Sequence, residues 1–232
     1  VSARDATQRE LRLRAARFPW HKTLEDFDFS AQPSVSRERV EALRRAANVG
    51  FLDPPGVGKS HLAVALGIRA AEAGFSVRFT TAQALTNHLY SSLADGSFRR
   101  ELERCGKVDL LIIDELGFLS LDRTASNHFF QVINQAYERQ SVILTSNRPF
   151  QEWAALSHDP VIVSAISDRL LHHVHLSNLK GESYRLRQQV QNCRRGCHPW
   201  PDTVTTYSIG GGFSWPEVGI LYVRLWAISN DG

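Results

Sequence analysis

Short apolar runs alternate with longer stretches of helical spacing along the middle of the chain. Strand-like runs occur at NVGFL (48–52), SVRFTT (76–81), VDLLIID (108–114), SVILTS (141–146) and VHLSN (174–178). The segments between them place apolar residues on one helical face, and Gly74 stops the first of these helices. The run 108–114 is apolar on both faces, as in a strand buried within a parallel sheet. Strands that alternate with helices predict an α/β fold, a parallel sheet with helices on both faces.

The loop between the first strand and the first helix carries a nearly complete phosphate-binding motif. The nucleotide-binding residues expected there are Pro55, Gly56, Val57, Gly58, Lys59, Ser60 and His61. Backbone N–H groups in such a turn can curl around an anion, and the N-terminus of the next helix adds positive potential. Lys59 is placed to reach terminal phosphates, and the Ser60 hydroxyl to complete a Mg²⁺ shell. The strand–turn–helix context disfavours the alternative, a Gly-rich turn that binds nothing.

Polar residues also follow the third and fourth predicted strands. Asp114 and Glu115 come after a run that we expect to lie beside the first strand, and Asn147 follows the fourth. Asp114 suits Mg²⁺, usually through water, because hard cations prefer carboxylate oxygens. Glu115 suits polarisation of an attacking water, and Asn147 suits its orientation. The acidic pair alone also fits a helix cap, but ligands in such sheets bind at the carboxyl ends of the strands, where all three residues fall.

Composition restricts the class of protein without deciding its function. The 232 residues are 43% hydrophobic and 22% charged, which is ordinary for a globular protein. Because no apolar run reaches about 18 residues, we expect no membrane span, and we expect no secretory leader. Three cysteines argue against a disulfide framework and for a cytoplasmic location. A formal charge of +3 permits nucleic-acid binding without requiring it.

Four segments carry a family resemblance when they are taken together. They are DPPGVGKSHLAVALG, VDLLIIDELGFLSLDRT, YERQSVILTSNRPFQEW and SDRLLHHVHLSNLKGESYRLR, within residues 17–187. As a set they resemble the ATP-binding helper proteins of insertion-sequence transposition, the IstB family, which are AAA+ ATPases similar to the DnaC helicase loader. The resemblance implies a P-loop NTPase fold of the AAA+ type that binds ATP and Mg²⁺. It also implies an ATP-dependent oligomer that assembles on double-stranded DNA and works with a cognate transposase.

The resemblance further implies roles for individual residues. Those implied for catalysis are Glu115, Asn147 and Arg169, with Ser60 and Asp114 as the metal ligands and Lys59 in the phosphate-binding loop. Arg169 matches an arginine finger that reaches the nucleotide of a neighbouring subunit. Without the family, an ion pair between Arg169 and Asp168 would be preferred. The segment KTLEDFDFS (22–30) resembles the strip that borders the adenine, and Arg185 stays unassigned.

One departure falls inside the phosphate-binding loop, where Asp53 stands in place of the opening Gly. A non-Gly residue forced to a left-handed φ loses roughly 1–2 kcal/mol. A carboxylate about 4 Å from a phosphate charge repels it by at most about 4 kcal/mol at an effective dielectric of about 20. That penalty corresponds to about three decades in affinity. Because Lys59 and the later glycines are intact, we expect impaired nucleotide binding rather than none.

We expect three parts along the chain: a basic helical N-terminal remnant (1–17), an AAA+ ATP-binding domain (18–187) and an atypical tail (188–232). The first is either a solvated surface helix or what remains of a DNA-contacting arm. The tail has a triple Gly, scattered aromatic residues and no helical period, so we interpret it as an extension unrelated to the ATPase. We expect no metal at the His-rich stretch 172–175 or at CRRGCH (193–198), whose spacing fits no common zinc or haem motif.

Three functions stay open at the level of sequence. The first is a DNA-dependent ATPase that assists a transposase or, as in DnaC-like proteins, loads a helicase. The second is a degenerate scaffold that binds DNA or partners but binds nucleotide weakly because of Asp53. The third, a P-loop kinase for a small molecule, ranks last because two acids and an Asn suit attack by water. Stimulation of phosphate release by DNA separates the first from the third.

Overall fold

A computed structural model describes residues 3–32, 34–42, 48–52, 55–118, 121–137, 139–149, 151–153, 157, 159–171, 174–178 and 183–184. All of them belong to one compact unit, Val1–Cys193. Within these ranges, no helix has the length and apolar character that a membrane crossing requires. Asp53, the tail 188–232, Arg185 and the side chains of the His-rich stretch lie outside the described residues.

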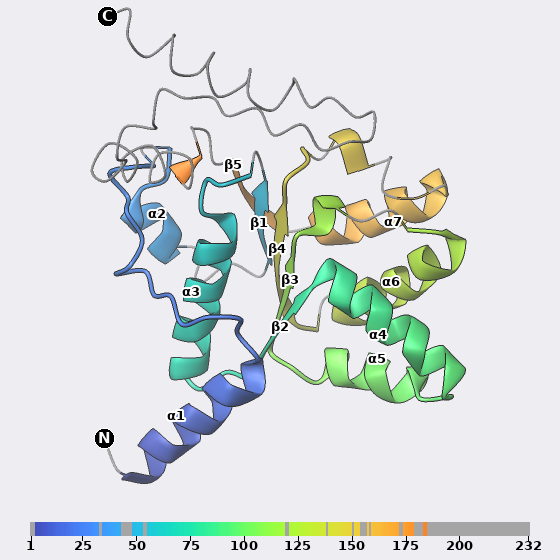
Figure 1. Ribbon diagram of the computed structural model, residues 1–232, viewed down its shortest axis with the longest axis horizontal. Coiled ribbons are helices and arrows are strands. Elements are labelled where there is room, and N and C mark those ends of the chain that lie inside the picture. The colour runs from blue at the N-terminus through green and yellow to red at the C-terminus, as the bar shows by residue number, and fades with distance from the viewer. Residues whose placement is uncertain are drawn as a thin grey trace, which may run out of the picture. The chain divides into compact units, whose positions relative to one another are not determined.

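Five parallel strands form the central sheet in the order β2-β3-β4-β1-β5 (Figure 1). They are β1 (Asn48–Leu52), β2 (Val77–Thr81), β3 (Leu110–Asp114), β4 (Ser141–Ser146) and β5 (Val174–Asn178). Each predicted strand is therefore confirmed. The expectation that the third strand lies beside the first is wrong, because β4 and β5 occupy the two hydrogen-bonding edges of β1, with Gly50 opposite Leu144 and Leu176.

Helices cover both faces of the sheet, as predicted. They are α1 (Ala3–Ala16), α2 (Arg37–Ala42), α3 (Lys59–Glu72), α4 (Ala82–Ala94), α5 (Phe98–Gly106), α6 (Arg123–Ala136) and α7 (Pro160–Leu171), with a short 3₁₀ turn at Leu116–Phe118. Figure 1 shows α1, α2 and α3 on one side of the strands and α4 to α7 on the other. The arrangement is the three-layer α/β architecture that alternating strands and helices produce.

The buried strand β3 divides its side chains between two hydrophobic cores. Leu110 and Ile112 pack in the core that contains the apolar face of α3, whereas Leu111 and Ile113 pack in the core beneath α4, α6 and α7. Successive side chains of a strand point to opposite faces, so an all-apolar strand can serve two layers. Each fully buried Leu or Ile side chain contributes about 1.5–3 kcal/mol through burial. These two cores hold the carboxyl ends of the strands in place.

Helices α4 and α6 begin at side-chain caps, whereas α3 does not. The Thr81 hydroxyl accepts a hydrogen bond from the Ala84 N–H at 3.1 Å at the start of α4. Asp122 accepts one from the Ala125 N–H at 2.8 Å at the start of α6. Such caps satisfy N–H groups that have no partner within the helix. At α3 the N-cap is Gly58, which offers no side chain.

The N-terminal helix α1 packs against α3 and β2 as part of the same unit. Ala16, its last residue, is fully buried. The Arg12 Nε donates a hydrogen bond to the Ala71 carbonyl at 3.1 Å, and Arg9 forms an ion pair with Glu72. Both partners lie at the C-terminal end of α3, where positive side chains interact favourably with the helix dipole.

Candidate functional site

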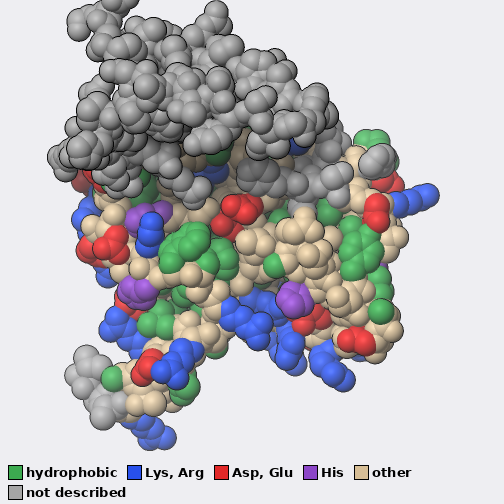
Figure 2. Space-filling view, in the orientation of Figure 1, with side chains coloured by type: hydrophobic (Ala, Val, Ile, Leu, Met, Phe, Trp, Pro, Cys, Tyr) green, Lys and Arg blue, Asp and Glu red, His purple; other side chains and the backbone are tan. Residues whose placement is uncertain are grey.

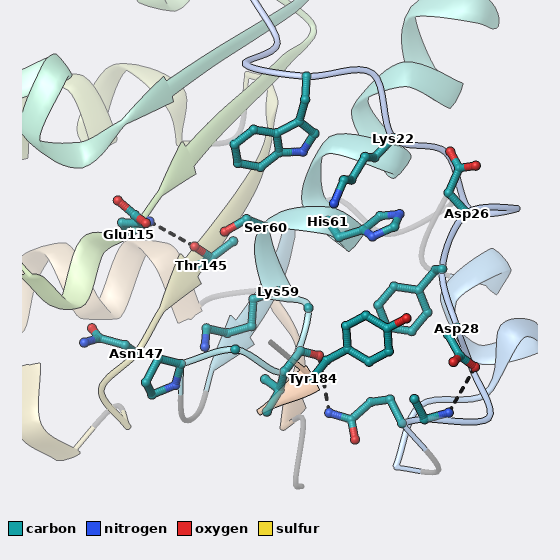
Figure 3. Close-up of a pocket in the computed structure, with 18 residues that line it drawn as sticks. Lys22, Asp26, Asp28, Lys59, Ser60, His61, Glu115, Thr145, Asn147 and Tyr184 are labelled. Carbon is teal, nitrogen blue, oxygen red and sulfur yellow. Dashed lines mark hydrogen bonds between the residues drawn. The ribbon is translucent and has the colours of Figure 1, made fainter. Parts of the chain in front are cut away.

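A cavity of about 400 Å³ opens at the carboxyl ends of β1, β3 and β4. Its lining comes from five stretches that are distant in sequence: residues within 20–32, the loop 55–61, Glu115, Thr145 with Asn147, and Tyr184. Figure 3 shows Glu115 and Asn147 on one side of the cavity and Asp26 and Asp28 on the other. The fold therefore brings the predicted loop, an acid and the predicted Asn around one space.

The phosphate-binding loop presents the uncapped start of α3 to this cavity. All seven predicted residues, Pro55 to His61, line it. Gly58 has φ 96°, a left-handed conformation that favours glycine, and a Cβ there would lie 2.6 Å from the Phe27 ring. The first intrahelical bond runs from the Leu62 N–H to the Gly58 carbonyl at 3.0 Å. The N–H groups that precede it have no helical acceptor, which makes this end of α3 suitable for an anion.

Asp114 lies at the end of β3 in a network of hydroxyl groups. Its side chain is buried, with 3% exposed. The Ser60 hydroxyl donates to Oδ1 at 2.9 Å, and the Thr145 hydroxyl donates to the same oxygen. A buried carboxylate held beside a Ser hydroxyl is a donor set that fits a hard divalent cation.

Glu115 directly follows Asp114 and has an unusual backbone. Its φ is 62°, in the left-handed region that non-Gly residues rarely adopt. The Glu115 N–H donates a hydrogen bond to the Thr145 hydroxyl at 2.9 Å, so one side chain of β4 contacts both acids (Figure 3). The Glu115 side chain is exposed and lines the cavity. Strained backbone of this kind persists where the surroundings hold it, often at functional sites.

Asn147 follows β4 and carries a buried acceptor without a partner. Its Oδ1 is enclosed and makes no hydrogen bond among the described residues. The same oxygen lies 1.9 Å from the point where a Cβ on Gly117 would stand. Only glycine at position 117 therefore allows Asn147 to sit here. A buried polar atom without a partner is uncommon and marks a place where water or a ligand binds.

The opposite wall is formed by the segment 20–32, which crosses the start of α3. The His61 Nε2 lies 2.8 Å from the Thr23 carbonyl oxygen, and because that oxygen can only accept, Nε2 carries the proton. The His61 ring packs edge-on against Phe27 with centroids 5.2 Å apart. Burial lowers the pKa of His61, and Lys22 adds to the shift, against opposing effects of the Thr23 carbonyl and Asp26. The neutral imidazole thus joins the loop to this segment.

We expect the His61 contact to make folding stability depend on pH. The pKa is lowered in the folded state from its ordinary value of 6.5, so the unfolded chain takes up a proton first as the pH falls. Stability from this residue is full above about pH 6.5 and declines below it. Urea unfolding measured well below and well above pH 6.5 should give a smaller difference in unfolding free energy between wild type and His61→Gln in acid than at neutral pH. A gap that widens in acid would contradict the assignment.

Tyr184, Gln32 and Thr145 line the cavity although none of them was predicted as a site residue. The Tyr184 N–H donates a hydrogen bond to the Gly56 carbonyl at 3.0 Å, so the segment after β5 contacts the phosphate-binding loop. Gln32 reaches the same loop through its side chain, whose Nε2 donates to the Val57 carbonyl at 3.3 Å. Thr145 was likewise missed, although a polar pair at the end of the apolar run SVILTS was a usable signal.

Arg169 lies apart from this cavity. It is on α7, where its Nε donates to the Asn134 Oδ1 at 3.0 Å and its Nη1 to the Ala165 carbonyl at 3.1 Å. Its guanidinium carbon stands 4.8 Å from the centre of the Phe130 ring. The structure shows no ion pair with Asp168. Arg169 does not line the cavity of its own chain.

The family follows from comparison with known proteins. A family model described as an IstB-like ATP-binding protein matches residues 1–192. This chain belongs to that IstB-like family. The match includes the N-terminal helix α1 in addition to the segments within 17–187 that carried the resemblance. The predicted P-loop fold of the AAA+ type is confirmed by the same comparison and by the structures below.

Relatives of this IstB-like chain are named as ATP-binding proteins of insertion sequences. One, named for IS21 of Pseudomonas aeruginosa, is 44% identical over 186 residues, which cover 78% of this chain and 70% of the relative. Another, named for IS5376 of Geobacillus stearothermophilus, is 43% identical over 183 residues, or 76% and 73% of the two chains. The association with insertion sequences that the motifs implied is thus supported.

Solved structures share the fold. DnaI matches with a TM-score of 0.59 at 19% identity, over 74% of this chain and 94% of DnaI. DnaA of Aquifex aeolicus with bound AMPPCP matches with a TM-score of 0.58 at 24% identity, over 75% of this chain. The IstB-like chain spans about half of that DnaA, 55% of its length. At these identities the likeness concerns the fold alone.

Proposed function

We propose that this IstB-like protein hydrolyses ATP to ADP and phosphate in the cavity at the carboxyl ends of its strands. The observation that carries the proposal is that Lys59, Ser60, Glu115 and Asn147 line one cavity from three separate stretches of chain. Asp114 lies directly behind Ser60, whose hydroxyl donates to its carboxylate. The open N-terminus of α3 takes the phosphates, and the Lys59 ammonium neutralises part of their charge. The ATP-binding family supports ATP as the nucleotide.

Mg²⁺ fits the donor set at the phosphate end of the cavity. The Ser60 hydroxyl and the Asp114 carboxylate stand 2.9 Å apart and would hold the ion, Asp114 through water. Bound there, Mg²⁺ would neutralise phosphate charge in the transition state. The Thr145 hydroxyl fixes the orientation of the Asp114 carboxylate, so the oxygen that faces Ser60 keeps its direction.

Glu115 and Asn147 act on the attacking water. The Glu115 carboxylate accepts a proton from that water as its oxygen bonds to the γ-phosphorus and the bond to the ADP oxygen breaks. Asn147 Oδ1, which makes no hydrogen bond among the described residues, accepts the second hydrogen of the water and orients it. The Thr145 hydrogen bond to the Glu115 N–H keeps the acid directed at this place.

Assembly on double-stranded DNA with a cognate transposase is the biological setting that we propose. Relatives named for insertion sequences support it, and so does the position of Arg169 away from its own cavity. An arginine finger acts from a neighbouring subunit, which makes hydrolysis depend on assembly. Figure 2 shows basic side chains on α1 and elsewhere on the same face. Affinity for DNA through such groups would fall as the salt concentration rises.

Asp53 favours a second candidate, a scaffold that binds DNA or partners with little nucleotide. Its carboxylate replaces the opening Gly of the loop motif and places negative charge where phosphates are expected. The rest of the cradle supports binding, since Lys59 and the start of α3 line the cavity. We therefore rank the active enzyme first.

The deciding experiment measures ATP affinity and hydrolysis, with and without duplex DNA, for the natural chain and for Asp53→Gly. We expect both to bind ATP and both to be stimulated by DNA, with Asp53→Gly tighter by at most about three decades. Lys59→Ala serves as the control for background binding, because it removes the ammonium group expected to contact the phosphates. Binding by Asp53→Gly alone would establish the scaffold. If neither chain binds ATP better than Lys59→Ala, the proposed ATPase is wrong.

A further inference from the structure

Gln32 is a polar side chain in the cavity wall that ATP hydrolysis does not use. It is buried, with 5% exposed, and it lines the cavity. Its Nε2 donates a hydrogen bond to the Val57 carbonyl. Because a carbonyl oxygen only accepts, this bond fixes the amide with its NH₂ group toward the phosphate-binding loop. The amide oxygen Oε1 then points elsewhere and makes no hydrogen bond among the described residues.

The backbone around Gln32 is held in one conformation. Asp28 Oδ1 accepts hydrogen bonds from the Ser30 N–H at 3.0 Å and the Ala31 N–H at 3.1 Å. The Gln32 N–H donates to the Phe29 carbonyl at 3.3 Å, and its own carbonyl accepts from the Val35 N–H at 3.1 Å. An acceptor carried on such a turn is placed before any ligand arrives, which is what selective recognition requires.

Gln32 belongs to the end of the cavity away from the hydrolytic residues. Figure 3 shows Asp28 and Tyr184 displaced from Glu115 and Asn147, with Lys59 between the two groups. The Phe27 ring lies beside Gly58, and the Tyr184 N–H donates to the Gly56 carbonyl, so both residues flank the Val57 that Gln32 contacts. Flat aromatic walls with one fixed polar atom suit a heterocyclic base. A nucleotide with its phosphates at Lys59 therefore extends its base toward Gln32.

We propose that Gln32 selects adenine over guanine, an inference that rests on the proposed ATPase. Its Oε1 accepts a hydrogen bond from the 6-amino group of adenine. Guanine carries a carbonyl oxygen at that position, so two acceptors would face each other without a proton between them. A site built around one hydrogen bond rejects the analogue that lacks it, because the buried polar group loses its partner.

The test compares nucleotide affinities of the full chain and two variants. The probes are the Mg²⁺ complexes of ATP, GTP, purine riboside triphosphate, which has hydrogen in place of the 6-amino group, and tripolyphosphate. On the natural chain we expect purine riboside triphosphate to bind about tenfold more weakly than ATP, as the loss of one hydrogen bond predicts. Gln32→Leu should lower the preference for ATP over GTP by at least about tenfold and weaken ATP more than tripolyphosphate, although it also removes the bond to the Val57 carbonyl.

Gln83→Leu makes the same substitution at an exposed glutamine on α4 and should change none of these affinities. If Gln32→Leu weakens tripolyphosphate as much as ATP, Gln32 only supports the loop and the proposal is overturned. Equal binding of ATP and purine riboside triphosphate by the natural chain overturns it without any variant. A natural chain that binds tripolyphosphate but no nucleotide selectively refutes base selection alone. One that binds none of the probes refutes the ATPase as well.

Discussion

Glu115→Gln should leave ATP affinity unchanged and lower the rate of ATP hydrolysis by about 10²- to 10⁴-fold, the usual contribution of general-base catalysis. The amide has the size and reach of the carboxylate but cannot accept the proton of the attacking water. The backbone at φ 62° and its hydrogen bond to Thr145 do not involve the side chain, so the substitution should not disturb them. Single-turnover hydrolysis and equilibrium binding of ATP measure the two effects separately.

Glu152→Gln is the matched control, since it makes the same change at an exposed glutamate outside the cavity. Its hydrolysis rate should equal that of the natural chain. An unchanged rate in Glu115→Gln would show that another group takes the proton. Loss of ATP binding in that variant, with a normal unfolding transition, would place Glu115 in binding rather than in catalysis.

Arg169→Ala should lower DNA-stimulated hydrolysis by about 10³- to 10⁵-fold, the range measured when an arginine finger is supplied or withheld. Binding of ATP should persist, because Arg169 does not line the cavity of its own chain. Hydrolysis slows because the transition state loses the positive charge that the arginine of a neighbouring subunit supplies. The rate per chain, followed over a range of protein concentrations, measures the effect.

Mixing the two inactive variants tests whether Arg169 acts between subunits. A Glu115→Gln chain keeps its arginine, and an Arg169→Ala chain keeps its acid. In an equimolar head-to-tail assembly, about a quarter of the interfaces join an intact cavity to an intact arginine, so activity should return. A mixture that stays inactive would contradict action between subunits. Asn134→Ala removes the partner of the Arg169 Nε and controls for packing within the chain.

Local pattern was sufficient to predict the strands, the helices on both faces and the phosphate-binding loop. Lys59, Ser60 and Asp114 were assigned because hydrophobic periodicity and the loop motif act over short stretches of chain. The structure places the Ser60 hydroxyl 2.9 Å from Asp114, so two motifs 54 residues apart meet as expected. Their roles in metal binding and hydrolysis stay predictions.

Contacts between distant segments could not be read from these patterns. The position of β4 between β1 and β3 follows from the path of the whole chain, and nothing in either strand specifies its neighbour. Gln32 and Tyr184 contact the loop from 25 and more residues away, and neither residue type indicates such a contact in the sequence. Thr145 could have been predicted, because a polar residue at the end of an apolar strand is buried and requires hydrogen-bond partners.

Both ends of helix α3 contact the N-terminal segment that includes α1 and Thr23. His61 fastens its first turn to Thr23, while Arg9 and Arg12 fasten its last turn. A protease cut or truncation that removes α1 would remove the contacts of Arg9 and Arg12 with the end of α3 and expose the surface of α3 and β2 that α1 covers. A shift of the first turn of α3 at the cavity would therefore also shift the contacts between α3 and α1. The N-terminal helix is in this sense part of the frame that holds the loop.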